Sequence, residues 1–122
     1  MKRLLTLTGL VALLSTLVLA ADAAGTWSGA FDFDGTSVPL TLSLKSGGDA
    51  VTGTVDGLPG GQSQIHDGKV KEDVITFWIL TDYQGSTYKL IFHGKQSADR
   101  IQFDFGTEDG SFSSPLTVRR SS

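Results

Sequence analysis

From Gly25 onward, apolar residues recur at every second position, and this period of two is the feature that most constrains the fold. In residues 40–45 leucine alternates with Thr, Ser and Lys, and residues 75–79, 88–92 and 101–105 alternate in the same way. Successive side chains of a strand point to opposite faces, so each of these segments has one apolar face, as a half-buried strand requires. The sequence therefore predicts an all-β domain with no helix after residue 24.

Clusters of turn-forming residues separate the alternating segments about every 10 to 13 residues. Gly and Asp dominate these clusters because they accept a positive φ or hydrogen-bond their own backbone. Seven such turns predict eight strands, over residues 25–33, 37–45, 50–57, 62–70, 73–81, 86–95, 99–106 and 111–119.

An internal repeat indicates how these strands pair. The motif Gly-Lys-x3-Asp-x-Ile-x-Phe occupies residues 68–77 and recurs over residues 94–103. The offset of two strands and two turns makes the repeating unit a hairpin, which predicts a meander of sequential antiparallel strands. In the fourth strand Ile65 and Val70 have opposite parity, and Asp67-Gly68 between them predicts a β-bulge.

Eight short sequential strands can close into a barrel or divide into a two-sheet β-sandwich. Closure removes two exposed edges, and the polar residues that usually guard an open edge are not obvious in this chain. We therefore expect an eight-stranded antiparallel up-and-down barrel, with the sandwich as the alternative.

Many large residues share the inward phase. An eight-stranded barrel is just wide enough to be filled by side chains or to hold one small ligand. With this many large residues, we expect a filled interior rather than a lipid-sized cavity. The predicted core residues are Trp27, Phe31, Phe33, Leu40, Leu42, Leu44, Val51, Val55, Ile75, Phe77, Ile79, Tyr88, Leu90, Phe92, Ile101, Phe103, Phe105, Leu116 and Val118.

The amino end has the three-part layout of a secretory signal peptide. A positive Lys2-Arg3 pair precedes an apolar run over residues 4–19, and small residues follow over 20–24. We place the signal peptide at residues 1–23 and the barrel domain at 24–122, with cleavage after Ala20 or after Ala23. A retained membrane anchor is the alternative, but a run of about 16 residues is shorter than the roughly 20 that a span needs. The predicted location is secreted or periplasmic.

Composition narrows the partners. The chain has no cysteine, which excludes both disulfides and a lipid-anchored lipoprotein, so the core alone must hold the domain together. Residues 25–122 carry eight Lys and Arg against twelve Asp and Glu, with no basic stripe. Nucleic acid and, after signal cleavage, a membrane surface are therefore not expected as partners.

Both ends of the domain carry a further pattern. Gly25-Thr26-Trp27 opens the first predicted strand, and Arg119 and Arg120 close the last. This resembles the calycin superfamily of lipocalin, fatty-acid-binding and avidin-type barrels. The resemblance implies that Trp27 packs against Arg119 or Arg120 and seals one end of the barrel. The repeated hairpins also resemble uncharacterised small exported bacterial β-modules, which imply no activity.

No residue set has the pattern of a catalytic, metal or cofactor site. His66 and His93 lie on different strands, and neither has a second ligand at metal spacing. The segment Asp32-x-Asp34-Gly35 begins like a calcium loop, but its glycine comes too early, so it is better explained as a hairpin turn. The inward positions hold Leu, Ile, Val and Phe, and no buried carboxylate is expected to have a shifted pKa. We expect a protein that is not an enzyme.

The strand predicted over residues 73–81 is apolar on both faces. Val74, Trp78 and Leu80 take its outward phase, and Ile91 on the neighbouring strand joins them. A contiguous exposed patch of this kind marks an interface with a protein partner or a second copy of the chain. Trp78 with Tyr83 is also a candidate stacking platform for a glycan ring.

These observations leave three functional hypotheses. The first is a non-catalytic exported binding module that recognises a protein, a glycan or a small apolar molecule through this outward face or through a barrel mouth. The second is a structural, envelope-associated domain that self-associates through the same face. The third, an enzyme, is disfavoured because no acid–base pair is evident.

Overall fold

The computed structural model describes residues 23–121, so residues 1–22 of the predicted signal peptide lie outside the described part. Within residues 23–121 no helix is long and apolar enough to cross a membrane. The described chain forms β1 (Gly25–Phe33), β2 (Thr36–Gly47), β3 (Ala50–Asp56), β4 (Ser63–Gln64), β5 (His66–Lys71), β6 (Val74–Tyr83), β7 (Ser86–Ser97), β8 (Arg100–Thr107) and β9 (Ser113–Arg120).

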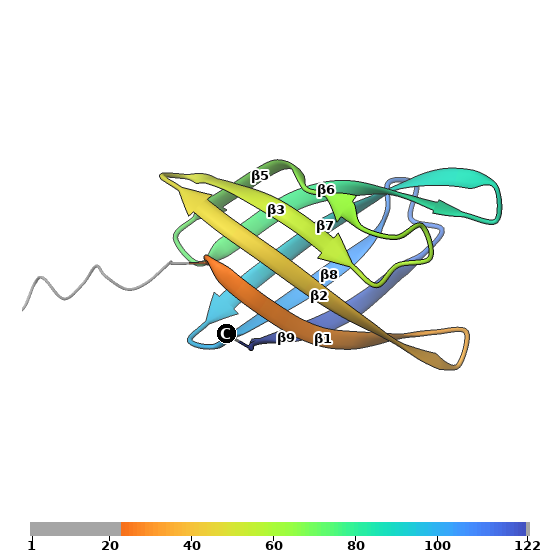
Figure 1. The fold of residues 1–122 in the computed structure, drawn as a ribbon, viewed down its shortest axis with the longest axis horizontal. Coiled ribbons are helices and arrows are strands. Elements are labelled where there is room, and N and C mark those ends of the chain that lie inside the picture. The colour runs from red at the N-terminus through yellow and green to blue at the C-terminus, as the bar shows by residue number, and fades with distance from the viewer. Residues whose placement is uncertain (1–22, 122) are drawn as a thin grey trace, which may run out of the picture.

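All of these strands belong to one antiparallel sheet that closes on itself (Figure 1). The short β4 and the longer β5 both pair with β3 and share one position in the wall, so the nine strands make an eight-stranded barrel. Sequential strands pair with each other, and β1 pairs with β9 to complete the circle. The predicted up-and-down barrel is confirmed, and the sandwich alternative is wrong.

The predicted bulge in the fourth wall position is confirmed. The register of β5 against β6 shifts between His66 and Lys69, and Asp67 there has a φ of 51°. A Cβ added at Gly68 would lie 2.0 Å from the Val51 carbonyl oxygen on β3, so only glycine allows this close approach. The bulge brings Val70 back into the inward phase, where it is buried.

The repeat found in the sequence has a structural role. After the β5–β6 turn the Asp73 carbonyl accepts a hydrogen bond of 2.8 Å from the Gln96 amide, and after the β7–β8 turn Asp99 accepts one of 2.8 Å from Arg120. A third turn follows the same pattern, because Asp49 accepts one of 2.8 Å from Val70. The backbone of each of these three turns is therefore hydrogen-bonded to a later strand: the β2–β3 turn to β5, the β5–β6 turn to β7 and the β7–β8 turn to β9.

The predicted core is confirmed except at two residues. Phe77, Phe92 and Phe105 lie opposite one another on β6, β7 and β8 and stack in a row with ring centroids 4.7 Å apart at both steps. Such in-register aromatic pairs stabilise neighbouring strands beyond the area that they bury. The two exceptions are Phe33, which is half-buried, and Tyr88, which is 40% exposed.

The two ends of the barrel differ. At one end lie the β2–β3, β5–β6 and β7–β8 turns together with the start of β1 and the end of β9 (Figure 1). The other end carries the β1–β2 and β6–β7 hairpin turns, and also the longer β3–β4 and β8–β9 connections. We call the first the closed end and the second the open end, and Phe33 and Tyr88 lie at the open end.

Replacing Gly94 by alanine should destabilise the barrel. Gly94 lies directly opposite Phe103, and an added Cβ would come within 2.4 Å of that ring in the core. We expect a loss of about 1–3 kcal/mol in the free energy of unfolding, measured by urea denaturation. Gly47→Ala is the matched control, since nothing lies within 4 Å of its added Cβ. A Gly94→Ala variant as stable as the Gly47→Ala variant would contradict this packing.

Candidate functional site

The closed end is sealed by Trp27. Its indole is fully buried, and Nε1 donates a hydrogen bond of 3.0 Å to the Ala23 carbonyl oxygen. The guanidinium carbon of Arg120 lies 4.3 Å from the centre of the indole ring, and its Nη1 donates to the Ala24 carbonyl at 2.7 Å. Of the two arginines named from the sequence, Arg120 contacts Trp27, whereas Arg119 is exposed and lies opposite Arg100.

The register of the closing strands explains this choice. Trp27 pairs directly with Arg120 across β1 and β9, so their side chains leave the sheet on the same side. Arg119 is one residue earlier and therefore points to the outside. Trp27 and Arg120 therefore fill the interior of the barrel at this end.

Trp78, the centre of the predicted outer face, is covered by its neighbours. The His66 ring stacks on it at 4.3 Å with an interplanar angle of 16°, and Lys89 Nζ lies 4.4 Å from the ring centre. They approach from opposite sides, because β5 and β7 flank β6 on opposite sides. The indole Nε1 donates to Asp67 Oδ2 at 2.8 Å. The indole is therefore already engaged by His66, Lys89 and Asp67, which limits its use as a stacking platform for a glycan.

The other residues of the predicted outer face are divided. Leu80 is 45% exposed and Ile91 is 40% exposed, while Val74 is half-buried. Lys89 lies directly opposite Leu80, which places an ammonium group beside the apolar strip. Tyr83 does not belong to this face, because it has the inward phase of β6 and lies at the open end of the barrel. The prediction that grouped Tyr83 with Trp78 on one face is wrong.

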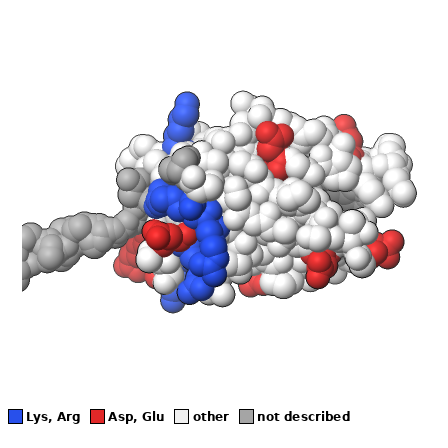
Figure 2. All heavy atoms as spheres, turned by 60° about the horizontal axis from the view of Figure 1, so that its bottom comes forward, with Lys and Arg blue, Asp and Glu red and all other residues white. Residues whose placement is uncertain are grey.

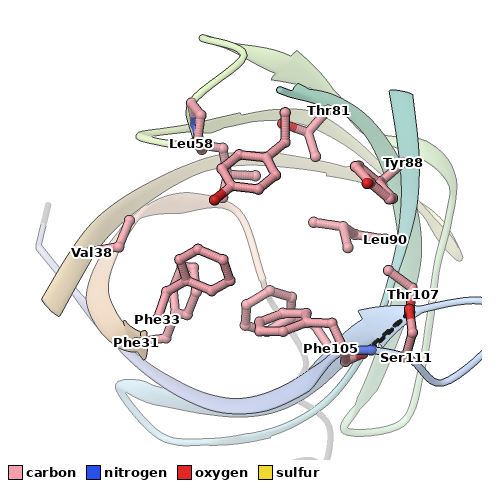
Figure 3. A pocket seen from close by; sticks show the side chains of 13 residues that line it. Phe31, Phe33, Val38, Leu58, Thr81, Tyr88, Leu90, Phe105, Thr107 and Ser111 are labelled. Carbon is pink, nitrogen blue, oxygen red and sulfur yellow. Dashed lines mark hydrogen bonds between the residues drawn. The ribbon is translucent and has the colours of Figure 1, made fainter. Parts of the chain in front are cut away.

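The open end holds a cavity of about 260 Å³ (Figure 3). The expectation of a filled interior is therefore wrong at this end. The walls of the cavity come from five strands and from the two longer connections. They consist of Phe31, Phe33, Val38, Leu58, Pro59, Thr81, Tyr83, Tyr88, Leu90, Phe105, Thr107, Ser111 and Phe112.

The cavity exists because aromatic side chains line this end instead of filling it. Phe33 meets the Tyr83 ring edge to face, with centroids 5.6 Å apart at 90°, and Phe31 meets Phe105 in the same way at 4.9 Å and 88°. Edge-to-face pairs hold rings against each other along a wall. The half-buried Phe33 and the exposed Tyr88 then stand at the mouth, where the wall ends.

Among the polar groups of the cavity, Thr81 is unusual. The residue is 7% exposed, and its Oγ1 has no hydrogen-bond partner among the described residues. The β3–β4 connection covers it closely, since a Cβ added at Gly60 would lie 3.2 Å from this oxygen. Buried hydroxyls are normally paired, and leaving one unpaired costs about 1–3 kcal/mol. This oxygen is enclosed by the β3–β4 connection, so a ligand in the cavity would reach it only after that connection shifts.

The β8–β9 connection at the cavity mouth is fixed by Asp109. The Ser111 amide donates to Asp109 Oδ1 at 2.9 Å, and the Thr107 hydroxyl donates to the same oxygen at 2.9 Å. These hydrogen bonds, the Ser111 amide first, hold the pKa of the Asp109 carboxyl below its usual value. The Asp109 carboxylate therefore keeps its charge to a lower pH than an ordinary aspartate does.

Residues 23–121 contain no group of three or more His, Cys, Asp or Glu side chains that could hold a metal ion. Of the two histidines, His66 stacks on Trp78, and His93 is exposed opposite Asp104 on β8. Comparisons of the chain with protein-family models, with curated proteins and with solved structures find no match.

Sequence reasoning missed the cavity, although one signal for it was present. The inward positions of β6 are Ile75, Phe77, Ile79, Thr81 and Tyr83, so two hydroxyl-bearing residues end an otherwise apolar row. A hydroxyl in the inward phase marks the level at which the core stops being packed with hydrocarbon. Leu58 and Phe112 could not be found in this way, because they reach the cavity from connections rather than from strands.

Replacing Arg120 by methionine should weaken the closed end more than the same change at Arg119. Arg120→Met loses the contact with the indole face and the hydrogen bond to Ala24, and we expect a loss of about 1–2 kcal/mol in the free energy of unfolding. Arg119→Met is the matched control and should change it by less than about 0.5 kcal/mol, as is usual for an exposed site. Urea denaturation of both variants measures this, and equal losses would argue against the assignment to Arg120.

Proposed function

We propose that this protein is a non-catalytic exported binding module that holds a small apolar ligand in the open end of its barrel. The observation that carries the proposal is the cavity itself, an aromatic-lined space of about 260 Å³ with one buried, unpartnered hydroxyl in its wall. Ligand sites are typically apolar concavities with a few polar groups that orient the ligand. Thr81 supplies such a group once the β3–β4 connection shifts to open its enclosed hydroxyl.

The volume supports a particular ligand size. An engineered apolar cavity of about 150 Å³ binds benzene, and drug-sized ligands occupy roughly 300–1,000 Å³. A space of about 260 Å³ lies between these cases, which favours a ligand of one or two fused rings. A long-chain lipid would need more room, because the half of the barrel towards the closed end is packed with side chains.

A calycin-like assignment agrees with this proposal. The support is the closed eight-stranded meander, the Gly25-Thr26-Trp27 motif on β1 and the Trp27–Arg120 contact at the closed end. In a barrel sealed in this way at one end, a ligand can enter only from the other. Glycan binding at the outer face is the weaker alternative, because the Trp78 ring is covered. Self-association through this face is also weaker, because the charged Lys89 lies beside the exposed Leu80.

Export of the chain would remove the signal peptide, and the closed end favours cleavage after Ala20. Cleavage after Ala23 would remove the carbonyl that accepts the hydrogen bond from Trp27 Nε1, whereas cleavage after Ala20 retains it. We expect the intact mass of protein secreted from a bacterial host to correspond to a chain that begins at Ala21. A mature chain that begins at Ala24 would show that the Trp27 hydrogen bond is dispensable for the exported protein.

The proposal predicts that a neutral bicyclic aromatic binds in the cavity. We expect 2-naphthalenemethanol to bind the mature protein with a Kd on the order of 10–100 µM, measured by isothermal titration calorimetry. Val38→Trp places a large ring in the cavity wall and should abolish this binding. Val38→Phe should weaken it, and this smaller change guards against misfolding of the tryptophan variant.

The matched control places the same ring outside the barrel. Ile91 is 40% exposed on the outer face, so Ile91→Trp should leave the Kd unchanged. If Ile91→Trp abolished binding and Val38→Trp did not, the ligand would lie on the outer face instead. If the wild-type protein did not bind, the cavity would not be a site for ligands of this class.

A further inference from the structure

The cavity carries no positive charge of its own. None of its lining residues is a Lys, an Arg or a His. A carboxylate buried there would have only hydroxyls as partners, and burying a charge without an opposite charge costs several kcal/mol. The aromatic lining acts in the opposite sense for a cation, because the face of a ring attracts positive charge. Phe31, Phe33, Tyr83 and Tyr88 supply such rings at or near the mouth.

The mouth of the cavity is acidic. Asp34 lies in the β1–β2 turn after the lining residue Phe33. Asp82 alternates with the lining residues Thr81 and Tyr83, so its side chain lies on the outer surface of the same end of the barrel. Glu108 and Asp109 lie in the connection between the lining residues Thr107 and Ser111. Together these acids form what we call the acidic rim, which consists of Asp32, Asp34, Asp56, Asp82, Glu108 and Asp109.

Basic residues lie at the other end of the molecule. Figure 2 shows the Lys and Arg side chains gathered towards one end, together with some acidic side chains, whereas the charged side chains visible towards the opposite end are acidic. Of the described basic residues, only Lys89 lies in the half of its strand nearest the open end. Its Nζ lies 3.4 Å from Glu108 Oε2 and over the Trp78 ring on the outer face, so it is already engaged. The far end holds Lys45, Lys69, Lys71, Lys95, Arg100, Arg119 and Arg120.

We propose that the open-end cavity selects an apolar ligand that carries an ammonium group and rejects the corresponding carboxylate. This inference rests on the proposed function, because it names the charge of the ligand that the cavity holds. The apolar body lies among the phenylalanine rings, and the ammonium group lies at the mouth between the aromatic ring faces and the acidic rim.

Three naphthalene ligands that differ in one substituent test the proposal. Calorimetric titration of the mature protein compares 2-naphthylmethylammonium, 2-naphthalenemethanol and 2-naphthoate at pH 7 and low salt. We expect the ammonium compound to bind best and the carboxylate to bind at least about tenfold more weakly than the ammonium compound, from the unpaired burial of its charge. Equal affinities for the ammonium compound and the carboxylate would overturn the proposal.

Rim variants separate the charge effect from the shape of the cavity. In Asp34→Asn/Asp82→Asn both side chains keep their size. Asparagine suits the φ of 54° at residue 34, and at residue 82 its amide oxygen can still accept the hydrogen bond from the Thr87 hydroxyl. We expect this variant to bind the ammonium compound about two- to threefold more weakly at low salt, with a smaller difference at 150 mM salt. The carboxylate should bind more tightly, and the alcohol should be unaffected.

Asp49→Asn/Asp99→Asn is the matched control, because it removes the same charge at the closed end. Its affinities for all three ligands should equal those of the wild type. If both double variants changed all three affinities alike, the rim would not select charge and the inference would fail while the proposed function stood. If the alcohol did not bind at all, the proposed function itself would fail, and this inference with it.

Discussion

The pairing of β1 with β9 is the contact on which the rest of this structure depends. Every other neighbouring pair of strands is joined by a short connection, whereas this pair brings together residues more than 80 positions apart and turns an open meander into a barrel. Its register places Trp27 opposite Arg120, so the same pairing that closes the wall also positions the groups that seal one end. A shift of β9 by one residue would turn Arg119 inward in place of Arg120 and turn the buried Leu116 and Val118 outward.

Sealing one end has a consequence for the other. The rows of leucine, valine and isoleucine near Trp27, together with the stacked phenylalanines of β6, β7 and β8, pack the interior up to about the level of Phe105. Beyond that level the strands continue, but their inward side chains are aromatic rings that lean against each other along the wall, and the space between them remains open. A packed half therefore supports an unpacked half, which is an arrangement suited to a rigid site on a small domain without disulfides.

How far the site could be predicted from the sequence depended on the kind of element that carries each residue. Strand residues such as Phe31, Leu90 and Phe105 follow the period of two, and their inward orientation was evident. Leu58 and Phe112 come from connections whose path has no period, and Tyr83 was assigned to the wrong face although its parity was inward. The cover of His66 and Lys89 over Trp78 was also hidden, because it depends on which strands flank β6 and on the bulge in β5.

The sequence by itself determined the all-β class, the number of wall positions, the turns, the bulge and nearly all of the core, because alternation and turn chemistry are local properties of the chain. The tertiary structure decided three other matters: which arginine meets Trp27, that the interior is filled at one end only, and that nearly all the basic side chains collect at the closed end. Each of these depends on the register and tilt of strands that are distant in the chain, and on how far each strand continues past the packed layers. No local pattern records those quantities, since they are set only when the sheet closes.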